Sequence, residues 1–532
     1  MACDCPINQV LKGTVQTIAR YFFLLVTFAV RKFLEWKHGV KGDRVAPITN
    51  PLLMHSATEL ASKIRAKELS SVEVMQAFIA RIKEINPLLN CVIDNRYDDA
   101  LKEAAEADDL IASGKFSTDE LAEQKPFLGV PISTKDNIGV KGLLLSAGLW
   151  SRRDVRAEED SDAMALMRKA GAIPFALTNV PELCMWWESF NTIFGKTNNP
   201  YDTNRIVGGS SGGEGVIQAS GGSPFGLGSD IGGSIRMPSF FNGVFGHKPS
   251  KNIVSNEKCF PKATSEEQNT FLGIGPMCRY ASDMKPVLKV LAGEKVKLLN
   301  LDKPVDVKNI RYFYQPNDGG SQLVSPVDDD QQVAVSKVIE HLKTFTTPTE
   351  TKLAALKESY GIWFANMKDD SGIGFDHQFT NYQGHMKPWN ELWKWFFGKS
   401  EHTIVAIIMV IMDKFEVAYG TPEYKKMVEK RNQLRDEISE LLGDNGVLIY
   451  PTHPTCALYH YESVFRPYNF SYTAIFNVLG FPATNVPLGL GAQQGLPTGI
   501  QVVANHNQDR LCLAVAEELE KAFGGWTPPK SN

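Results

Sequence analysis

The chain has 532 residues, of which 43% are hydrophobic and 22% are charged, and its formal net charge is -4. This composition supplies enough apolar material for a large core and does not match that of a disordered chain. The small net charge, with no dominant basic stripe in the sequence, argues against nucleic acid as a partner.

The first predicted element is an apolar segment, Tyr21 to Val30, within residues 1–45. Ten residues of helix rise about 15 Å, which is about half of a bilayer core. We therefore expect residues 1–45 to be either a marginal membrane anchor, lengthened by snorkelling arginines, or an interfacial helix. Positive charge is heavier after the segment than before it, so a spanning helix would leave the bulk of the chain in the cytosol, on an intracellular membrane.

Amphipathic helices are predicted next along the chain. Ser56 and Glu59 have the spacing of a capping box, and Ser70 and Glu73 repeat this signal ahead of apolar residues at helical intervals. A third helix is predicted for Tyr97 to Ser113. Because polar and apolar faces alternate in all three, we expect them to lie on the outside of the fold.

Short apolar runs in the middle of the chain predict buried strands. Phe127 to Thr134 and Ile173 to Leu177 are such runs, and the predicted helix Asp162 to Ala170 lies between them, which favours an α/β fold. No internal repeat or linker divides residues 46–532, so we expect them to form one domain. Further strands are predicted at Gly446 to Thr452, Asn485 to Leu488 and Gly499 to Val503, followed by a helix from Ala504 to Phe523.

Three segments carry the chemistry. They read PISTKDNIG (131–139), GGSSGGEG (208–215) and DIGGSIRMPS (230–239), and glycine is dense from Val207 to Gly246. Such density indicates close approach of the backbone or positive φ. The G-x-S-x-G match at Ser210 would make that residue the nucleophile of an α/β-hydrolase, but this short motif is a weak signal by itself.

Together, in this order and spacing, the three segments resemble the amidase signature family. SIRMPS (234–239) and GVFGHKPS (243–250) are similar to its fatty-acid amide hydrolase branch. The resemblance implies an α/β fold with a single twisted mixed β-sheet surrounded by α-helices. It also implies hydrolysis of primary fatty-acid amides and N-acyl ethanolamines without metal or cofactor, and it leaves a homodimer open.

The resemblance assigns a Ser–Ser–Lys triad. Ser234 would be the nucleophile, Ser210 the proton bridge and Lys135 the base. A serine hydroxyl needs a base to become a good nucleophile, and lysine can be that base only when neutral. Burial lowers the pKa of lysine by up to about 3–5 units, and Lys135 follows an apolar run that suits a dry position.

The glycine-rich loop before the nucleophile suits an oxyanion hole. Successive backbone N–H groups without bulky side chains form an anion-binding concavity. We interpret Asp230 and Arg236 as an ion pair that holds the loop in place. By resemblance, the donors of the oxyanion hole come from Ile231, Gly232, Gly233 and Ser234.

Other segments indicate how a lipid substrate would bind. By resemblance, CMWW (184–187) borders the acyl chain, so Cys184 and Met185 are candidate substrate-binding residues, with Ser211 as a third candidate. Residues 385–415 contain a broad apolar helical face with tryptophans and lysines. They predict either a buried helix pair or a cap that docks on a membrane surface.

Two other classes of function stay open from the sequence. The chain could be an amidase of short-chain or aryl amides, or an amidotransferase-type subunit. Alternatively, it could be a non-catalytic lipid-binding protein at a membrane. Labelling of Ser234 by a fluorophosphonate probe would separate an active hydrolase from such a binding protein.

Overall fold

The fold is built on one eleven-stranded mixed sheet, seen in a computed structural model that describes residues 6–39 and 41–529. Its strands are β1 (Val92–Asn95), β2 (Pro131–Lys135), β3 (Ile173–Thr178), β6 (Phe225–Asp230), β7 (Phe245–Lys248), β8 (Gly273–Cys278), β9 (Arg311–Tyr314), β10 (Thr349–Glu350), β11 (Gly446–Pro451), β12 (Ala483–Leu490) and β13 (Pro497–Ala504). They lie in the order β1-β3-β2-β6-β8-β7-β12-β13-β11-β9-β10. A separate pair consists of β4 (Phe190–Asn191) and β5 (Gly195–Lys196).

The sheet combines parallel and antiparallel pairs, as predicted. Strand β2 pairs in parallel with β3 and β6, whereas β6, β8, β7, β12, β13 and β11 follow one another in antiparallel pairs. Every residue of β2, β3 and β6 is buried. Since strands buried on both faces read as short continuous apolar runs, this explains why β3 (IPFALT) could be recognised from the sequence, whereas most of the apolar run that predicted β2 (PISTK) lies before the strand.

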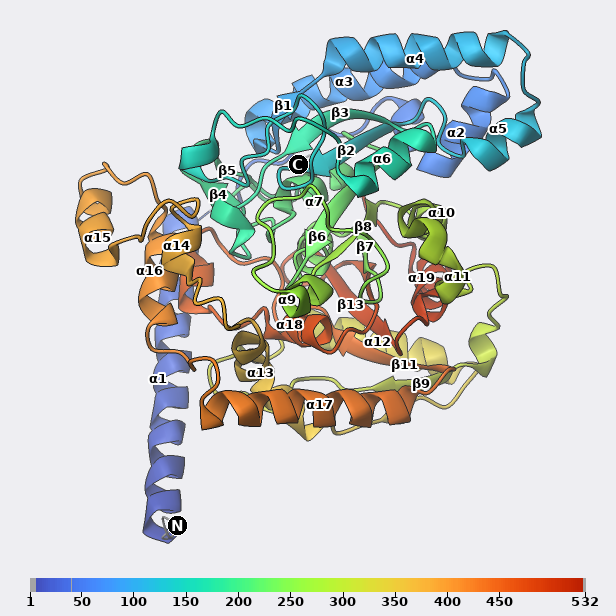
Figure 1. Cartoon of the computed structure of the whole chain (residues 1–532). Coiled ribbons are helices and arrows are strands. Elements are labelled where there is room, and N and C mark those ends of the chain that lie inside the picture. Colours follow the sequence, from blue (N-terminus) through green and yellow to red (C-terminus); the bar gives the residue numbers. More distant parts are fainter. Residues whose placement is uncertain (1–5, 40, 530–532) are drawn as a thin grey trace.

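Helices surround this sheet (Figure 1). Helices α3 and α4 lie together at the β1–β3 end, and α17 packs against β11 toward the other end. The helices are α1 (Pro6–His38), α2 (Ala57–Arg65), α3 (Ser71–Leu89), α4 (Tyr97–Ala112), α5 (Thr118–Gln124), α6 (Asp162–Lys169), α7 (Gly212–Ala219), α8 (Arg236–Phe241), α9 (Glu266–Phe271), α10 (Ala281–Ala292), α11 (Val296–Leu299), α12 (Asp329–Lys343), α13 (Ser359–Asn366), α14 (Phe375–Gln378), α15 (Pro388–Phe396), α16 (Ile404–Asp413), α17 (Pro422–Leu442), α18 (Ser471–Val478) and α19 (Asp509–Phe523).

The predicted helix starts are confirmed at two places. Ser56 accepts a hydrogen bond from the Glu59 amide while the Glu59 carboxylate accepts one from the Ser56 amide, so α2 begins with a complete capping box. Ser70 caps α3 by accepting from the Glu73 amide. Each of these capping contacts joins residues three positions apart, so the sequence alone was enough to predict it.

Two predicted boundaries are wrong by several residues. The strand expected from Phe127 begins only at Pro131, because Leu128 to Val130 form turns around Gly129, whose φ is +78°. The helix expected from Ala504 begins at Asp509, because Ala504 still pairs with Val447 in the sheet. In the first case the apolar residues Leu128 and Val130 belong to the turns before the strand, and in the second the apolar Ala504 belongs to strand β13.

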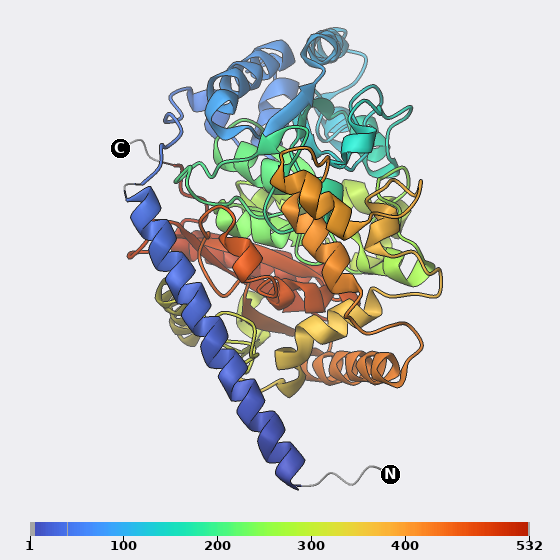
Figure 2. The same ribbon diagram turned by 90° about the vertical axis from the view of Figure 1, so that its left-hand side faces the viewer.

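Helix α1 is longer than the apolar segment that predicted it, and it lies along the flank of the body (Figure 2). The Arg31 guanidinium lies 3.2 Å from the buried Glu462 carboxylate, and Arg20 donates to the carbonyl oxygen of Val324 at 2.6 Å. Among residues 6–39 and 41–529, none of the helices is both long enough and apolar enough to traverse a bilayer.

The apolar face predicted within residues 385–415 is exposed. Trp389, Trp393 and Phe396 of α15 are 63%, 68% and 73% exposed, so this helix is not half of a buried pair. In contrast, α16 buries Ala406, Ile407 and Val410 against the body. Figure 1 shows α15 projecting from the same side of the molecule along which α1 runs.

Candidate active site

Lys135 is the last residue of β2, and its side chain is fully buried. Its Nζ atom lies 2.8 Å from Ser229 Oγ, 3.3 Å from Ser229 O and 2.7 Å from Ser210 Oγ. Burial lowers the pKa of Lys135. A neutral amine has two hydrogens and one lone pair. Since Ser229 offers two acceptors, the lone pair is left for the Ser210 hydroxyl proton.

Ser210 and Ser211 occupy the loop that leads into α7. Ser210 is 2% exposed, and its hydroxyl contacts Lys135 as described above. Ser211 is buried, its Oγ atom donates to Ser229 O at 3.3 Å, and its amide donates to Ser234 O at 3.1 Å. The side chain of Ser211 therefore faces the loops that carry the site and is not among the residues that line the cavity described below.

Ser234 lies between the end of β6 and the start of α8, and its side chain is 8% exposed. It lines the same cavity as Ser210. Because β2 and β6 are adjacent parallel strands, their carboxyl ends bring Lys135 and the Ser234 loop to the same edge of the sheet. The topology thus accounts for the shared edge of Lys135 and Ser234, and Ser210 joins the site through its 2.7 Å contact with Lys135 Nζ.

The loop before Ser234 is held by a buried ion pair. Arg236 Nε lies 3.0 Å from Asp230 Oδ2, and neither side chain is exposed to solvent. Burial alone would raise the pKa of Asp230, but the Arg236 guanidinium outweighs burial and holds this pKa below its usual range. The sequence-based interpretation of these two residues as an ion pair is confirmed.

The same carboxylate also organises the backbone of the loop. Asp230 Oδ1 accepts from the Gly233 amide at 2.7 Å, and Gly233 has a φ of +112°. The amide of Gly233 is therefore already engaged in this structure. This leaves the amides of Ile231, Gly232 and Ser234 as the donors that an oxyanion could use.

We call the space in front of Ser234 the catalytic cavity. It has a volume of about 180 Å³, and most of the surface that lines it is apolar. Cys184 and Met185, two of the three candidate substrate-binding residues from the sequence, line it, whereas the third, Ser211, does not. Aromatic side chains from distant elements complete the wall, namely Trp186, Trp187, Tyr360, Trp363, Phe364, Phe375, Tyr468 and Phe470.

Comparison with known proteins agrees with this geometry. The amidase family model matches residues 73–513. The chain belongs to the amidase signature family. It is 47% identical to fatty-acid amide hydrolase 2-A of Danio rerio over 95% of both chains, and 45% identical to fatty-acid amide hydrolase 2 of Homo sapiens over 91% of this chain and 92% of that protein. A solved fatty acid amide hydrolase structure superimposes with a TM-score of 0.72 at 25% identity, covering 89% of this chain and 86% of that one.

Sequence reasoning missed three residues of this amidase site. Ser229 and Asn137 form a support for Lys135, since the Ser229 hydroxyl donates to Asn137 Oδ1 at 3.2 Å. Glu214 is fully buried, and its carboxylate accepts from the hydroxyls of Ser133 and Thr178. Burial raises the pKa of Glu214 to about 7. All three lie in or beside the quoted segments, and the pairing of β2 with β6 was the signal needed to find them.

Proposed function

We propose that this chain hydrolyses fatty-acid amides to a free fatty acid and an amine through an acyl-enzyme on Ser234. The observation that carries the proposal is the buried Lys135 amine, 2.7 Å from the Ser210 hydroxyl at the wall of a cavity that also contains Ser234. The similarity to fatty-acid amide hydrolases supports the substrate class.

In the proposed acylation step, Ser234 Oγ attacks the amide carbonyl carbon. Its proton passes to Ser210, whose own proton passes to Lys135 Nζ, so the amine becomes an ammonium. The carbonyl electrons move onto oxygen, which the free amides of the loop stabilise. One such donor contributes about 2.7–4 kcal/mol to the stability of the transition state.

The tetrahedral intermediate then collapses. The ammonium of Lys135 returns its proton through Ser210 to the leaving nitrogen as the C–N bond breaks, so the amine leaves neutral. Water, activated by the same two residues, then attacks the acyl ester and releases the fatty acid. Lys135 and Ser210 end each cycle in their starting protonation states.

The walls of the catalytic cavity favour an acyl chain over a small or charged substrate. Trp363, Phe470 and Met409 contribute apolar surface far beyond what a short amide would cover. This lining argues against a short-chain amidase and an amidotransferase-type subunit. The intact lysine–serine contact argues against a protein that only binds lipid.

Incubation with oleamide tests the proposed function. We expect release of oleic acid and ammonia, and a covalent mass increase on the Ser234 peptide when turnover is quenched. Ser234→Ala should abolish both. Turnover by Ser234→Ala, or an acyl group found on Ser210, would contradict the assignment of the nucleophile.

We further propose that the enzyme works at an intracellular membrane surface, with its catalytic domain in the cytosol. Arg20 and Arg31 contact the body on either side of the apolar segment of α1. This favours a helix that lies on the membrane surface over one that crosses the membrane. Its outer side would then face lipid together with α15. From residue 17 to its end, the large exposed apolar residues of α1 are Ile18, Tyr21, Phe22, Leu25, Phe28, Phe33 and Trp36.

A further inference from the structure

Two side chains from distant helices hold the backbone of residues 231–234, which we call the oxyanion loop. The Trp363 indole of α13 donates to Ile231 O at 2.9 Å, and the Thr473 hydroxyl of α18 lies 2.9 Å from Gly232 O. Thr473 Oγ1 lies at the same distance from the carbonyl oxygen three residues before it, so its one proton is shared between two acceptors. Trp363 is therefore the firmer of the two anchors.

The hydrogen bond from Trp363 sets the direction of the Gly232 amide. The carbonyl of Ile231 and the N–H of Gly232 belong to one trans peptide group, in which the two bonds lie in one plane and point in opposite directions. Gly232 lines the catalytic cavity, and its amide is one of the donors left for an oxyanion. By holding the carbonyl, the indole therefore fixes the direction in which this donor points.

The oxyanion loop cannot fix this direction by its own side chains. Two of its residues are Gly232 and Gly233, and glycine has the widest choice of backbone conformations. The Asp230 carboxylate accepts from the amides of Gly233 and Ile235, both of which follow Gly232 in the chain. The peptide group before Gly232 thus depends on the contact with Trp363.

The indole of Trp363 is itself held in place. Its ring meets the edge of the Phe470 ring at an interplanar angle of 84°, with the ring centroids 5.0 Å apart. A Cβ atom at Gly232 would lie 3.5 Å from Trp363 Cζ2 and 3.6 Å from Phe470 Cδ2, so both rings pack against this part of the loop. An anchor in a fixed position suits a donor that must be aimed before the reaction begins.

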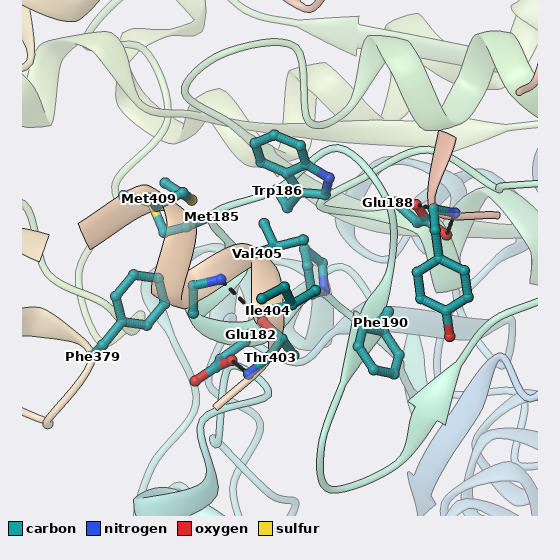
Figure 3. A pocket seen from close by; sticks show the side chains of 13 residues that line it. Glu182, Met185, Trp186, Glu188, Phe190, Phe379, Thr403, Ile404, Val405 and Met409 are labelled. Atoms are coloured by element: carbon teal, nitrogen blue, oxygen red, sulfur yellow. Dashed lines mark hydrogen bonds between the residues drawn. The ribbon is translucent and has the colours of Figure 1, made fainter. Parts of the chain in front are cut away.

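A second tryptophan of the cavity wall has a different hydrogen-bond partner. Trp186 also lines the catalytic cavity, but its indole donates to Ser463 Oγ at 3.0 Å. Figure 3 shows Trp186 together with Met185 and Met409, on the α16 side of the wall. Because an indole has a single N–H, Trp186 shares the wall with Trp363 but not the hydrogen bond to the oxyanion loop.

We propose that Trp363, supported by Thr473, is a positioning residue that aims the Gly232 amide at the oxyanion of the tetrahedral intermediate. The proposal rests on the proposed acyl-enzyme at Ser234. An amide that is aimed at charge developing in the transition state stabilises this state more than the bound substrate. Loss of the indole N–H should therefore lower kcat and weaken the binding of ligands that form an oxyanion.

The test compares two inhibitors with the same alkyl chain, pentadecyl trifluoromethyl ketone and the corresponding secondary alcohol. Ser234 Oγ adds to the ketone carbon, its proton passes through Ser210 to Lys135, and the carbonyl oxygen becomes an oxyanion. The alcohol has no carbonyl and cannot form this adduct. The ratio of the two affinities therefore reports the oxyanion hole separately from binding of the chain.

Trp363→Phe keeps an aromatic ring in the wall but removes the indole N–H. We expect it to lower the ketone-to-alcohol affinity ratio by about 10- to 100-fold, the loss that a small misplacement of a reacting group causes. The kcat for oleamide should fall by a similar factor. Trp186→Phe is the matched control, because any loss of chain contact there lowers both affinities alike and leaves the ratio at the parent's value.

Thr473 provides a second pair of variants. Thr473→Val removes the hydroxyl and should also lower the affinity ratio, whereas Thr473→Ser keeps the hydroxyl and should restore most of it. A parent-like ratio in Trp363→Phe, or in Thr473→Val if Trp363→Phe does not fold, would overturn the proposal. So would equal ratios in Trp363→Phe and Trp186→Phe. A parent enzyme that binds the ketone no better than the alcohol would instead refute the proposed acyl-enzyme at Ser234.

Discussion

At the scale of single residues, the protonation state of Lys135 decides the chemistry. The amine is surrounded by two acceptors of Ser229 and the hydroxyl of Ser210. Among the residues that the structure describes, no carboxylate lies within hydrogen-bonding distance of it. Without such a partner, burial disfavours the ammonium form. In the proposed mechanism, a residue placed in this way serves proton transfer at the expense of the stability of the fold.

Lys135→Met tests both consequences. We expect the rate of fatty-amide hydrolysis to fall by about 10²–10⁴-fold, the usual contribution of a general base. The free energy of unfolding near neutral pH should stay the same or rise. The reason is that burial lowers the pKa of Lys135 in the folded chain, so the native lysine lowers stability at pH values below its unfolded pKa. Urea denaturation with an activity assay measures both, and a marked loss of stability would contradict this reasoning.

At the scale of elements, the loop between β6 and α8 depends on the Asp230–Arg236 pair. Removing one partner leaves the other charge buried and uncompensated. We expect Arg236→Met to lower the free energy of unfolding by about 3–5 kcal/mol.

The double variant Asp230→Asn/Arg236→Met is the control for this prediction. It should cost less than the sum of the two single substitutions, because no buried charge remains without a partner. Additive losses in urea denaturation would show that the two side chains do not stabilise each other.

The elements also show what could be predicted from the sequence. The capped helices α2 and α3 and the apolar strand β3 follow from local patterns. Strand β6, which leads to Ser234, does not, because its sequence FGLGSD reads as a loop. Its glycines are required by packing, since a Cβ atom at Gly226 would overlap the Glu214 carboxylate of α7.

Likewise, the motifs identify the triad residues, but they do not identify the residues that support Lys135. Lys135, Ser210 and Ser234 stand in recognisable segments, whereas the role of Ser229 depends on the pairing of β2 with β6. The walls of the catalytic cavity come from α13, α16 and the segment before α18, which are far apart in sequence and carry no shared pattern. Tertiary contacts alone bring them together.

At the scale of the whole molecule, two exposed apolar surfaces lie on one flank. Figure 2 shows that the flank turned toward the viewer carries both α1 and the α15–α16 region. Lys387, Lys394 and Lys399 accompany the tryptophans of α15, a combination typical of helices at a bilayer interface. The catalytic cavity is lined in part by α14 and α16, so a lipid substrate could enter beside this flank.

Flotation with liposomes that contain anionic lipid tests this orientation. Phe22→Glu on α1 and Trp393→Glu on α15 should each reduce the bound fraction severalfold, since each replaces a side chain that is more than half exposed with a charge. Val333→Glu on α12 is the matched control and should bind as the parent does. Equal binding by all four proteins would show that this flank is not the docking surface.

The most direct test of the central claim is the pH dependence of Ser234 labelling by a fluorophosphonate probe, measured as a rate. Because burial lowers the pKa of Lys135, labelling should speed up as rising pH removes the proton from the amine, and this rise should come at a lower pH than for an ordinary lysine. Lys135→Ala should label orders of magnitude more slowly and should lose this dependence. A Lys135→Ala enzyme that labels at the parent's rate and with the parent's pH profile would contradict the account.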